Sequence, residues 1–251
     1  MVSSRAAECV RRGTPFPVTY LSVRPFERLA EATAPDGTLL SLYRHDGAYL
    51  IRVDGVELMS TRRSHAEREL ARSACASLAN ATAPHVLIGG LGFGFTLRAA
   101  LEILPADARV VVAELIPEVI EWNRNPDNDL AGGALRDPRV DLRHADVSNV
   151  LRESPGVFDA ILLDVDNGAE PITTADNARL YGAAGIRRTL AALKSDGCVA
   201  YWSAIPAPQF MKLLGRVGLE ATAQQVRAHA TSGPLHTIML ARRAVKPAPL
   251  A

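Results

Sequence analysis

Short apolar runs alternate with helical patterns through residues 80–241 of the chain. In the helical patterns the apolar residues recur every three or four positions, whereas most of the short runs are apolar almost throughout. Strands with this composition belong to a largely parallel sheet that helices cover on both faces. We therefore predict an α/β domain. Its seven predicted strands cover residues 86–88, 109–115, 140–144, 158–165, 198–203, 220–227 and 236–241, and its predicted helices cover 97–104, 116–123, 147–152, 178–193 and 206–217.

Residues 36–61 carry a different pattern, in which Asp-Gly pairs separate short segments of alternating polarity. The pairs begin at Asp36, Asp46 and Asp54, and Asp-Gly suits the positive φ angles of tight hairpin turns. The pattern predicts a small antiparallel meander, which needs a larger partner to pack against. Its predicted strands cover residues 38–45, 48–53 and 56–61.

A helix is predicted to follow the meander, because Ser64 and Glu67 have the Ser-x-x-Glu spacing of a capping box. An apolar stripe from Leu70 to Leu78 continues this helix, and we place a domain boundary near residue 80. The predicted organisation has three parts. They are an N-terminal arm, the meander and a linking helix in residues 1–80, a Rossmann-like cofactor-binding domain in residues 81–245, and a disordered tail in residues 246–251.

Composition narrows the classes of function open to the 251 residues. The net charge is +1 and the paired arginines are scattered, so we expect no basic face for nucleic acid. Three cysteines without a CxxC pair disfavour a disulfide framework or a zinc site, and no metal is expected. No apolar run approaches the roughly 18 residues of a membrane span, and no secretory leader is visible. We expect a cytoplasmic protein without a membrane partner.

A glycine-rich stretch follows the apolar run that ends at Ile88, and a helical pattern starts directly after it. Glycine is needed where φ is positive and where backbone must approach a ligand closely. The N-terminus of the following helix offers free N–H groups and a partial positive charge. A plain strand-turn-helix connection without a ligand gives the same pattern, so this turn alone does not decide. Its residues are Gly90, Leu91, Gly92, Phe93 and Gly94.

Acidic residues stand at the ends of the next three predicted strands, and ligands of open α/β sheets bind beyond those ends. Glu114 lies about twenty residues past the glycines, where a carboxylate accepts both ribose hydroxyls. Asp146 either accepts the adenine amino group or caps the helix that starts after it. Asp164 and Asp166 point the same way, because they are alternate residues of an extended segment.

This arrangement favours a cofactor of the S-adenosylmethionine type over a dinucleotide. A carboxylate at the mouth of the site takes a proton from an amine nucleophile or holds its cation. Trp202 ends the fifth predicted strand and either forms a wall of the pocket or packs in the core. No P-loop Lys-Ser/Thr follows the glycines and no serine nucleophile elbow is visible, which disfavours an NTPase and an α/β-hydrolase.

In these segments the sequence resembles the spermidine synthase family, the polyamine aminopropyltransferases that are built on the class I methyltransferase fold. The likeness extends over residues 38–241 and is carried by residues 86–101, 111–121, 137–146, 158–164 and 180–197. It implies a Rossmann-like domain with a mostly parallel seven-stranded sheet, preceded by a small β-domain. It also implies a role in polyamine biosynthesis, with transfer of an aminopropyl group from decarboxylated S-adenosylmethionine to a small-molecule amine. Members of the family pair through the small β-domain, which makes a homodimer possible.

The resemblance also assigns site residues. Catalysis is expected at Asp164 and Asp166. An acceptor pocket is expected to include Asp166, Asn167, Tyr181 and Trp202. Cofactor contacts are expected at Gly90, Leu91, Gly92, Phe93, Gly94, Glu114, Leu115, Asp146, Val147 and Asp164.

Phe93 marks the main difference from the family pattern. It stands where the family has an aspartate that holds the ammonium group of the aminopropyl chain. The acid motif Asp164-Val165-Asp166 also places its second acid one position closer and lacks the family's proline, and a family glutamine has no match near Met59. Phenylalanine neither attracts that ammonium nor repels the carboxylate of S-adenosylmethionine. Two alternatives therefore stay open: an S-adenosylmethionine-dependent methyltransferase acting on a small molecule, and a non-catalytic family member that binds a nucleoside.

Overall fold

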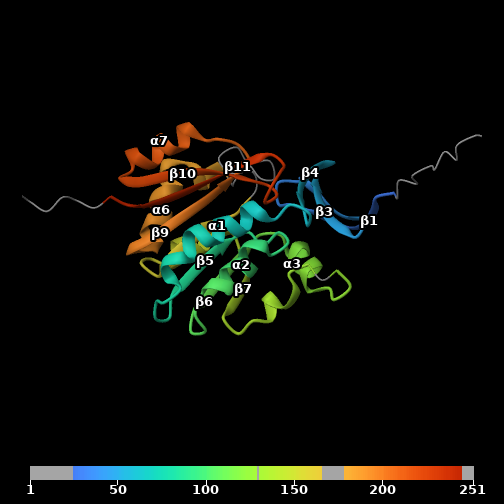
Figure 1. Ribbon diagram of the computed structural model, residues 1–251, viewed down its shortest axis with the longest axis horizontal. Coiled ribbons are helices and arrows are strands. Elements are labelled where there is room, and N and C mark those ends of the chain that lie inside the picture. The colour runs from blue at the N-terminus through green and yellow to red at the C-terminus, as the bar shows by residue number, and fades with distance from the viewer. Residues whose placement is uncertain (1–24, 129, 166–177, 245–251) are drawn as a thin grey trace, which may run out of the picture.

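The computed structural model describes residues 25–128, 130–165 and 178–244. Within these ranges the chain forms a small and a large β-sheet, which lie side by side (Figure 1). The predicted N-terminal arm and C-terminal tail lie outside the described residues. None of the helices in the described ranges is both long enough and apolar enough to cross a membrane.

The small sheet is an antiparallel meander, as predicted, but it has a fourth strand. Both residues of the Asp46-Gly47 and Asp54-Gly55 pairs have positive φ, which explains the two hairpin turns that join the last three strands. The additional strand lies at the edge of the sheet and carries mostly exposed residues, so its sequence lacks a hydrophobic alternation. In order across the sheet the strands are β1 (Glu27–Thr33), β2 (Leu39–His45), β3 (Ala48–Val53) and β4 (Val56–Ser60).

The large sheet confirms the predicted Rossmann-like α/β architecture of the class I methyltransferase type. Its strand order is β10-β11-β9-β8-β5-β6-β7, and β11 alone runs antiparallel to both of its neighbours. β5 comes first in the chain among the strands of this sheet, and it lies centrally, where the direction of strand addition reverses. The strands are β5 (His85–Gly89), β6 (Arg109–Glu114), β7 (Val140–His144), β8 (Phe158–Leu163), β9 (Leu193–Ser203), β10 (Leu219–Arg227) and β11 (Leu235–Arg243).

Alternate residues of the central strands supply two separate layers of core. Val86 and Ile88 pack in one layer with α1, α2 and α3, whereas Leu87 packs in the other with α4, α5, α6 and α7. The buried meander residues join the first layer, so the small sheet is packed onto the large domain. The helices are α1 (His65–Cys75), α2 (Phe95–Ile103), α3 (Pro117–Arg124), α4 (Val147–Glu153), α5 (Ala178–Tyr181), α6 (Ala183–Ala192) and α7 (Pro208–Arg216), with short 3-10 turns η1 (Ala76–Leu78) and η2 (Gly132–Arg136).

The single helix predicted for residues 178–193 is wrong, because the structure has two helices there, α5 and α6. Gly182 is extended, with φ −80° and ψ 164°, and forms the N-cap of α6. The strand that follows begins at Leu193, five residues before its predicted start at Cys198, as the bounds of β9 show.

The predicted capping box at the start of α1 is also wrong. Ser64 occupies the N-cap position, but its side chain accepts no capping hydrogen bond. Glu67 lies on the buried side of the helix with Leu70 and Ala71, and its carboxylate faces a pocket. Helix α1 itself forms as expected and packs against α2 and β9, so this linking helix contacts the large domain.

Candidate active site

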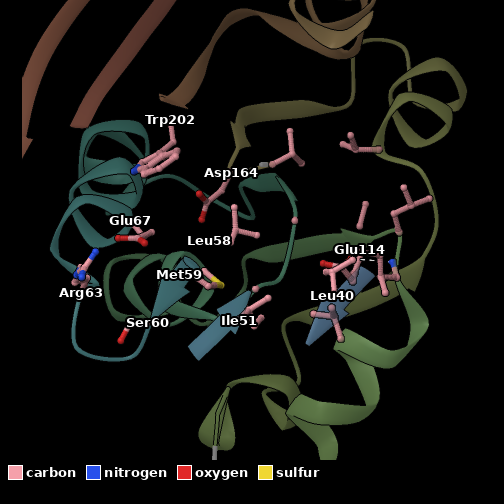
Figure 2. Close-up of a pocket in the computed structure, with 18 of the residues that line it drawn as sticks. Leu40, Ile51, Leu58, Met59, Ser60, Arg63, Glu67, Glu114, Asp164 and Trp202 are labelled. Carbon is pink, nitrogen blue, oxygen red and sulfur yellow. Dashed lines mark hydrogen bonds between the residues drawn. The ribbon is translucent and has the colours of Figure 1, made fainter. Parts of the chain in front are cut away.

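A pocket lies between the meander and the carboxyl ends of the large sheet's central strands (Figure 2). Its walls come from the meander, helix α1, the loops that follow β5, β6, β7 and β8, and the strands β9 and β11. The lining residues include predicted site positions and several that the sequence did not suggest. They are Leu40, Ile51, Glu57, Leu58, Met59, Ser60, Arg63, Glu67, Gly90, Gly92, Ala113, Glu114, Leu115, Ile116, Val119, Ala145, Asp146, Val147, Asp164, Val165, Trp202, Ala228 and His236.

The glycine turn forms the floor of this pocket. Gly90 has φ +89°, and its N–H donates to the carbonyl oxygen of Ala113 at 2.9 Å. A Cβ atom on Gly90 would lie only 2.3 Å from the carbonyl oxygen of Asp164. Glycine is therefore required here because the turn packs directly against the backbone that carries a predicted catalytic acid.

Side chains from the neighbouring helices α2 and α3 donate hydrogen bonds to the backbone of the same turn. The amide nitrogen of Asn123 donates to the carbonyl oxygen of Gly92 at 2.8 Å. The Arg98 guanidinium donates to the carbonyl oxygens of Phe93 at 3.3 Å and Leu130 at 2.6 Å. The bonds to Gly92 and Phe93 fix the backbone of the turn, and the bond to Leu130 ties the same arginine to a neighbouring loop. No sequence pattern indicated either residue, because both act through contacts between separate elements.

Glu114 ends β6 and is held by backbone donors on both sides. Its two carboxylate oxygens accept the N–H groups of Leu91 and Ile116, each at 2.8 Å. Burial raises the pKa of Glu114, and the backbone hydrogen bonds oppose that shift by stabilising the anion. A carboxylate has about four acceptor sites, so the two oxygens retain capacity for a diol. This arrangement fits the predicted role of Glu114 toward ribose hydroxyls.

The predicted adenine end of the site is mostly apolar. Asp146 caps α4, because its Oδ1 accepts the Ser148 N–H at 2.7 Å, and it also lines the pocket. Leu115 and Val147 line the same part of the pocket, together with Val119. An apolar slot with a few polar groups at its rim is the usual form of a site for a flat aromatic ring.

Asp164 follows β8 and is fixed from two directions. Its N–H donates to the carbonyl oxygen of Gly89 at 3.0 Å, and the hydroxyl of Thr96 donates to its Oδ2 at 2.5 Å. Burial raises the pKa of Asp164, whereas the Thr96 hydroxyl lowers it. A carboxyl group with a raised pKa is suited to general-base catalysis near neutral pH.

Glu67 brings a second carboxylate to the same side of the pocket (Figure 2). Burial raises its pKa, and the negative charge of Asp164 raises it further. The Ser64-x-x-Glu67 spacing indicated a capping role instead, and no other sequence pattern indicated that this side chain turns inward.

Trp202 forms the wall beside these two acids. Its side chain is buried, and its indole N–H has no hydrogen-bond partner among the described residues. His236 lies next to it, with 4.8 Å between ring centroids, and burial followed by the charge of Arg63 lowers the pKa of this histidine. Arg63 itself pairs with Glu57 at 3.3 Å and is half exposed. Trp202, which the sequence placed either at the pocket or in the core, thus lines this pocket and is also part of a core cluster.

Several predicted site residues lie elsewhere. The Phe93 side chain is fully buried and contacts Phe95 edge to face, so it does not line the pocket. Tyr181 packs against Tyr201 and Phe210, outside the pocket lining, because α5 places its ring in the second core layer. Leu91 and Gly94 contribute through the backbone of the turn and are absent from the lining. Asp166 and Asn167 lie outside the described residues.

Comparisons with known proteins agree with this geometry. The sequence is similar to a polyamine aminopropyltransferase of Synechococcus sp. (strain JA-2-3B'a(2-13)), with 26% identity over 171 residues. Two crystal structures of spermidine synthase, one of them from Thermotoga maritima, match with a TM-score of 0.68 and 19% identity over 88% of this chain and 73% of theirs. The chain has the fold of spermidine synthase. The expected resemblance is thus confirmed in sequence and in fold.

The extent of the sequence match is limited. It covers 65% of this chain and 54% of the aminopropyltransferase, so the chain matches about half of that relative's length. No family model matches the chain. One of the two spermidine synthase structures was determined in complex with the transition-state analogue AdoDATO.

The contact between Gly90 and Asp164 predicts a specific sensitivity. Gly90→Ala places a Cβ atom against the Asp164 carbonyl in a left-handed backbone conformation. Gly55→Ala is the matched control, since Gly55 has φ +83° but nothing within 4 Å of the added Cβ. We expect Gly55→Ala to cost about 1–2 kcal/mol and Gly90→Ala at least about 2 kcal/mol more, measured by urea unfolding. Equal losses in the two variants would show that the close approach is not a constraint.

The buried carboxyl of Glu67 predicts a pH dependence of stability. Its pKa rises from 4.5 to about 8 on folding, so the folded state holds the proton over this range while the unfolded state releases it. The free energy of unfolding therefore falls as pH rises from 4.5 to 8. Asp164, His236 and Arg63 line the same pocket. These three residues are present both in the wild type and in the Glu67→Gln variant that tests the prediction.

Glu67→Gln removes the titrating group and should reduce this loss by at least about 1.4 kcal/mol, the equivalent of one pKa unit. Chemical unfolding at pH 5 and pH 8 measures the difference. Glu69→Gln, on the same helix but in a surface ion pair with Arg72, should follow the wild type. Parallel pH profiles for wild type and Glu67→Gln would contradict the assignment of a raised pKa.

Proposed function

We propose that the protein is an aminopropyltransferase, which moves the aminopropyl group of decarboxylated S-adenosylmethionine to a small amine. The observation that carries the proposal is the position of Asp164. Asp164 lies at the end of β8, with its backbone against the glycine turn and its side chain in the same pocket as Glu114. The similarity to a polyamine aminopropyltransferase and the spermidine synthase fold support the same activity.

Each part of the donor has a matching part of the pocket. Glu114 accepts the ribose hydroxyls, for which its fixed carboxylate retains acceptor capacity. The apolar slot of Leu115, Val119 and Val147 holds the adenine ring, with Asp146 at its rim. Gly90 and Gly92 line the pocket as well, so the turn offers backbone to the sulfonium end.

Asp164 acts on the acceptor amine. The amine arrives as an ammonium ion, and Asp164 takes one proton from it, which frees the nitrogen lone pair. The nitrogen then forms a bond to the carbon next to the sulfonium sulfur. The carbon–sulfur bond breaks, its electron pair stays on sulfur, and neutral methylthioadenosine leaves. Because the sulfonium is already a good leaving group, we expect positioning of the two reactants to supply most of the rate enhancement.

Methyl transfer from S-adenosylmethionine is the second candidate function, and the burial of Phe93 favours it. The turn presents no carboxylate at this position, so nothing there selects the ammonium of the decarboxylated donor or repels the carboxylate of S-adenosylmethionine. Arg63 also lines the pocket, and its guanidinium is a cation that could pair with the carboxylate of S-adenosylmethionine. In the empty pocket it pairs with Glu57 instead.

Product analysis decides between these functions. Purified protein is incubated with putrescine and either decarboxylated S-adenosylmethionine or S-adenosylmethionine, and the nucleoside product is identified by mass. We expect methylthioadenosine with the decarboxylated donor only. S-adenosylhomocysteine would instead identify a methyltransferase. Absence of both products, with methylthioadenosine still binding in calorimetry, would identify a non-catalytic nucleoside-binding protein.

Asp164→Asn tests the assigned proton acceptor. Asparagine keeps the size of the side chain and its contact with Thr96 but does not take up a proton. We expect kcat to fall by a factor of about 10² to 10⁴, the usual contribution of a general base, with little change in the donor's KM. Asp141→Asn, at an exposed position on β7, is the control and should keep wild-type turnover. Unchanged turnover in Asp164→Asn would remove Asp164 from the mechanism.

A further inference from the structure

We infer that Glu67 binds a primary ammonium group of one of the two reactants and completes an amine site with Asp164. This inference rests on the proposed function for the identity of the reactants. The ammonium group belongs either to the acceptor amine or to the aminopropyl chain of the donor, and both offer the same chemistry to a carboxylate. Three observations support it: the burial of Glu67, the lack of a counter-ion for it among the described residues, and the unpartnered indole N–H of Trp202 in the same wall.

Glu67 is only 9% exposed, yet it has no counter-ion in the described part of the chain. The ion pairs of the surrounding residues join other partners, such as Arg68 with Glu102 and Arg72 with Glu69. Its neighbours on α1, Ala66 and Leu70, are buried in the core. Such surroundings disfavour the ionised form, so the carboxyl group of Glu67 holds its proton while the pocket is empty, in agreement with its raised pKa. Loss of that proton needs a compensating positive charge. A cationic ligand in the pocket supplies this compensation.

Thr96 joins Glu67 to Asp164. Its hydroxyl oxygen lies 2.5 Å from Oδ2 of Asp164 and 3.4 Å from the carbonyl oxygen of Glu67. The start of α1, the start of α2 and the end of β8 therefore meet at one threonine. This contact keeps two acidic side chains together on one side of the pocket, although their mutual repulsion opposes that arrangement.

The other charged groups of this wall do not neutralise Glu67. Arg63 is half exposed and pairs with Glu57, and the lowered pKa of His236 keeps that ring uncharged at neutral pH. Trp202 adds a second, independent indication of a ligand. It is 8% exposed, it lines the pocket, and its buried indole N–H has no partner among the described residues. A polar group of this kind is normally satisfied, so this N–H marks the wall as a ligand surface. Because an ammonium group is itself a donor, the indole N–H donates to an acceptor atom elsewhere on the ligand.

The position of Glu67 also explains how the site manages without an acid in the glycine turn. Phe93 points into the core, so the turn leaves an ammonium group without a partner. Glu67 and Trp202 lie on the side of Asp164 that is away from Glu114 (Figure 2). An ammonium group bound there is therefore close to the reacting centre and separate from the nucleoside end.

Steady-state kinetics of Glu67→Gln test the inference, with putrescine and decarboxylated S-adenosylmethionine as the probes. Loss of one charge-assisted hydrogen bond should raise a KM by about 10- to 100-fold, while kcat falls less. An increase for putrescine assigns the ammonium to the acceptor, and an increase for the donor assigns it to the aminopropyl chain. Glu67→Asp keeps the charge and should recover part of the affinity. Glu69→Gln is the control on the same helix and should match the wild type. Thermal unfolding confirms that every variant is folded.

Unchanged KM values for both reactants in a folded Glu67→Gln protein would overturn the inference. Its failure is distinguishable from failure of the proposed function. If the wild type forms no methylthioadenosine, calorimetric titration with putrescine and with decarboxylated S-adenosylmethionine tests Glu67 alone. Weaker binding of either probe to Glu67→Gln supports the ammonium site. Equal binding to both proteins, or no binding of either probe to the wild type, contradicts it.

Discussion

Two carboxyl groups, Glu67 and Asp164, share one side of a largely apolar pocket, and no residue in the described part of the chain places a cation between them. Burying such a pair is unfavourable, because each group loses hydration and each repels the other. The fold holds them there through neutral contacts: Thr96 joins them, and the backbone of Gly89 and Gly90 fixes the loop that carries Asp164. The two acidic groups thus lower the free energy of unfolding while the pocket is empty. A bound cationic ligand offsets this loss, because it compensates their negative charge.

The remainder of the site depends on the same packing. The parallel strands bring Glu114, Asp146 and Asp164 to one edge of the large sheet, as expected for this topology. The meander closes that edge from above with residues such as Met59, whose terminal methyl carbon would lie 2.7 Å from a Cβ atom on Gly92. A pocket between two packed sheets has a lower effective dielectric than bulk water, which strengthens the electrostatic attraction between carboxylates and an ammonium ion. The small sheet therefore contributes directly to the chemistry proposed for the large one.

The sequence predicted the parts of the site that local patterns and topology determine. Apolar runs located the central strands, glycines located the turn, and the acid at the end of each strand followed from the fold class. The sequence did not predict three further features, two of which depend on contacts between distant segments and one on the exposure of an edge strand. Ser64-x-x-Glu67 has the spacing of a capping box, and only the packing of α1 on the large domain turns Glu67 into the pocket. Edge strand β1 lacks alternation because most of its residues are exposed. Packing likewise places Phe93 in one core layer and Tyr181 in the other, so neither side chain lines the pocket.

The most direct measurement of the paired-acid account is a crystal structure of the protein with methylthioadenosine and putrescine bound. The account predicts the ribose hydroxyls on Glu114 and one putrescine nitrogen within hydrogen-bond distance of Asp164. If the acceptor supplies the ammonium, the Glu67 carboxylate contacts putrescine as well. If the donor supplies it, Glu67 contacts the ammonium in a second complex with decarboxylated S-adenosylmethionine. A Glu67 carboxylate without an ammonium contact in both complexes would contradict the account.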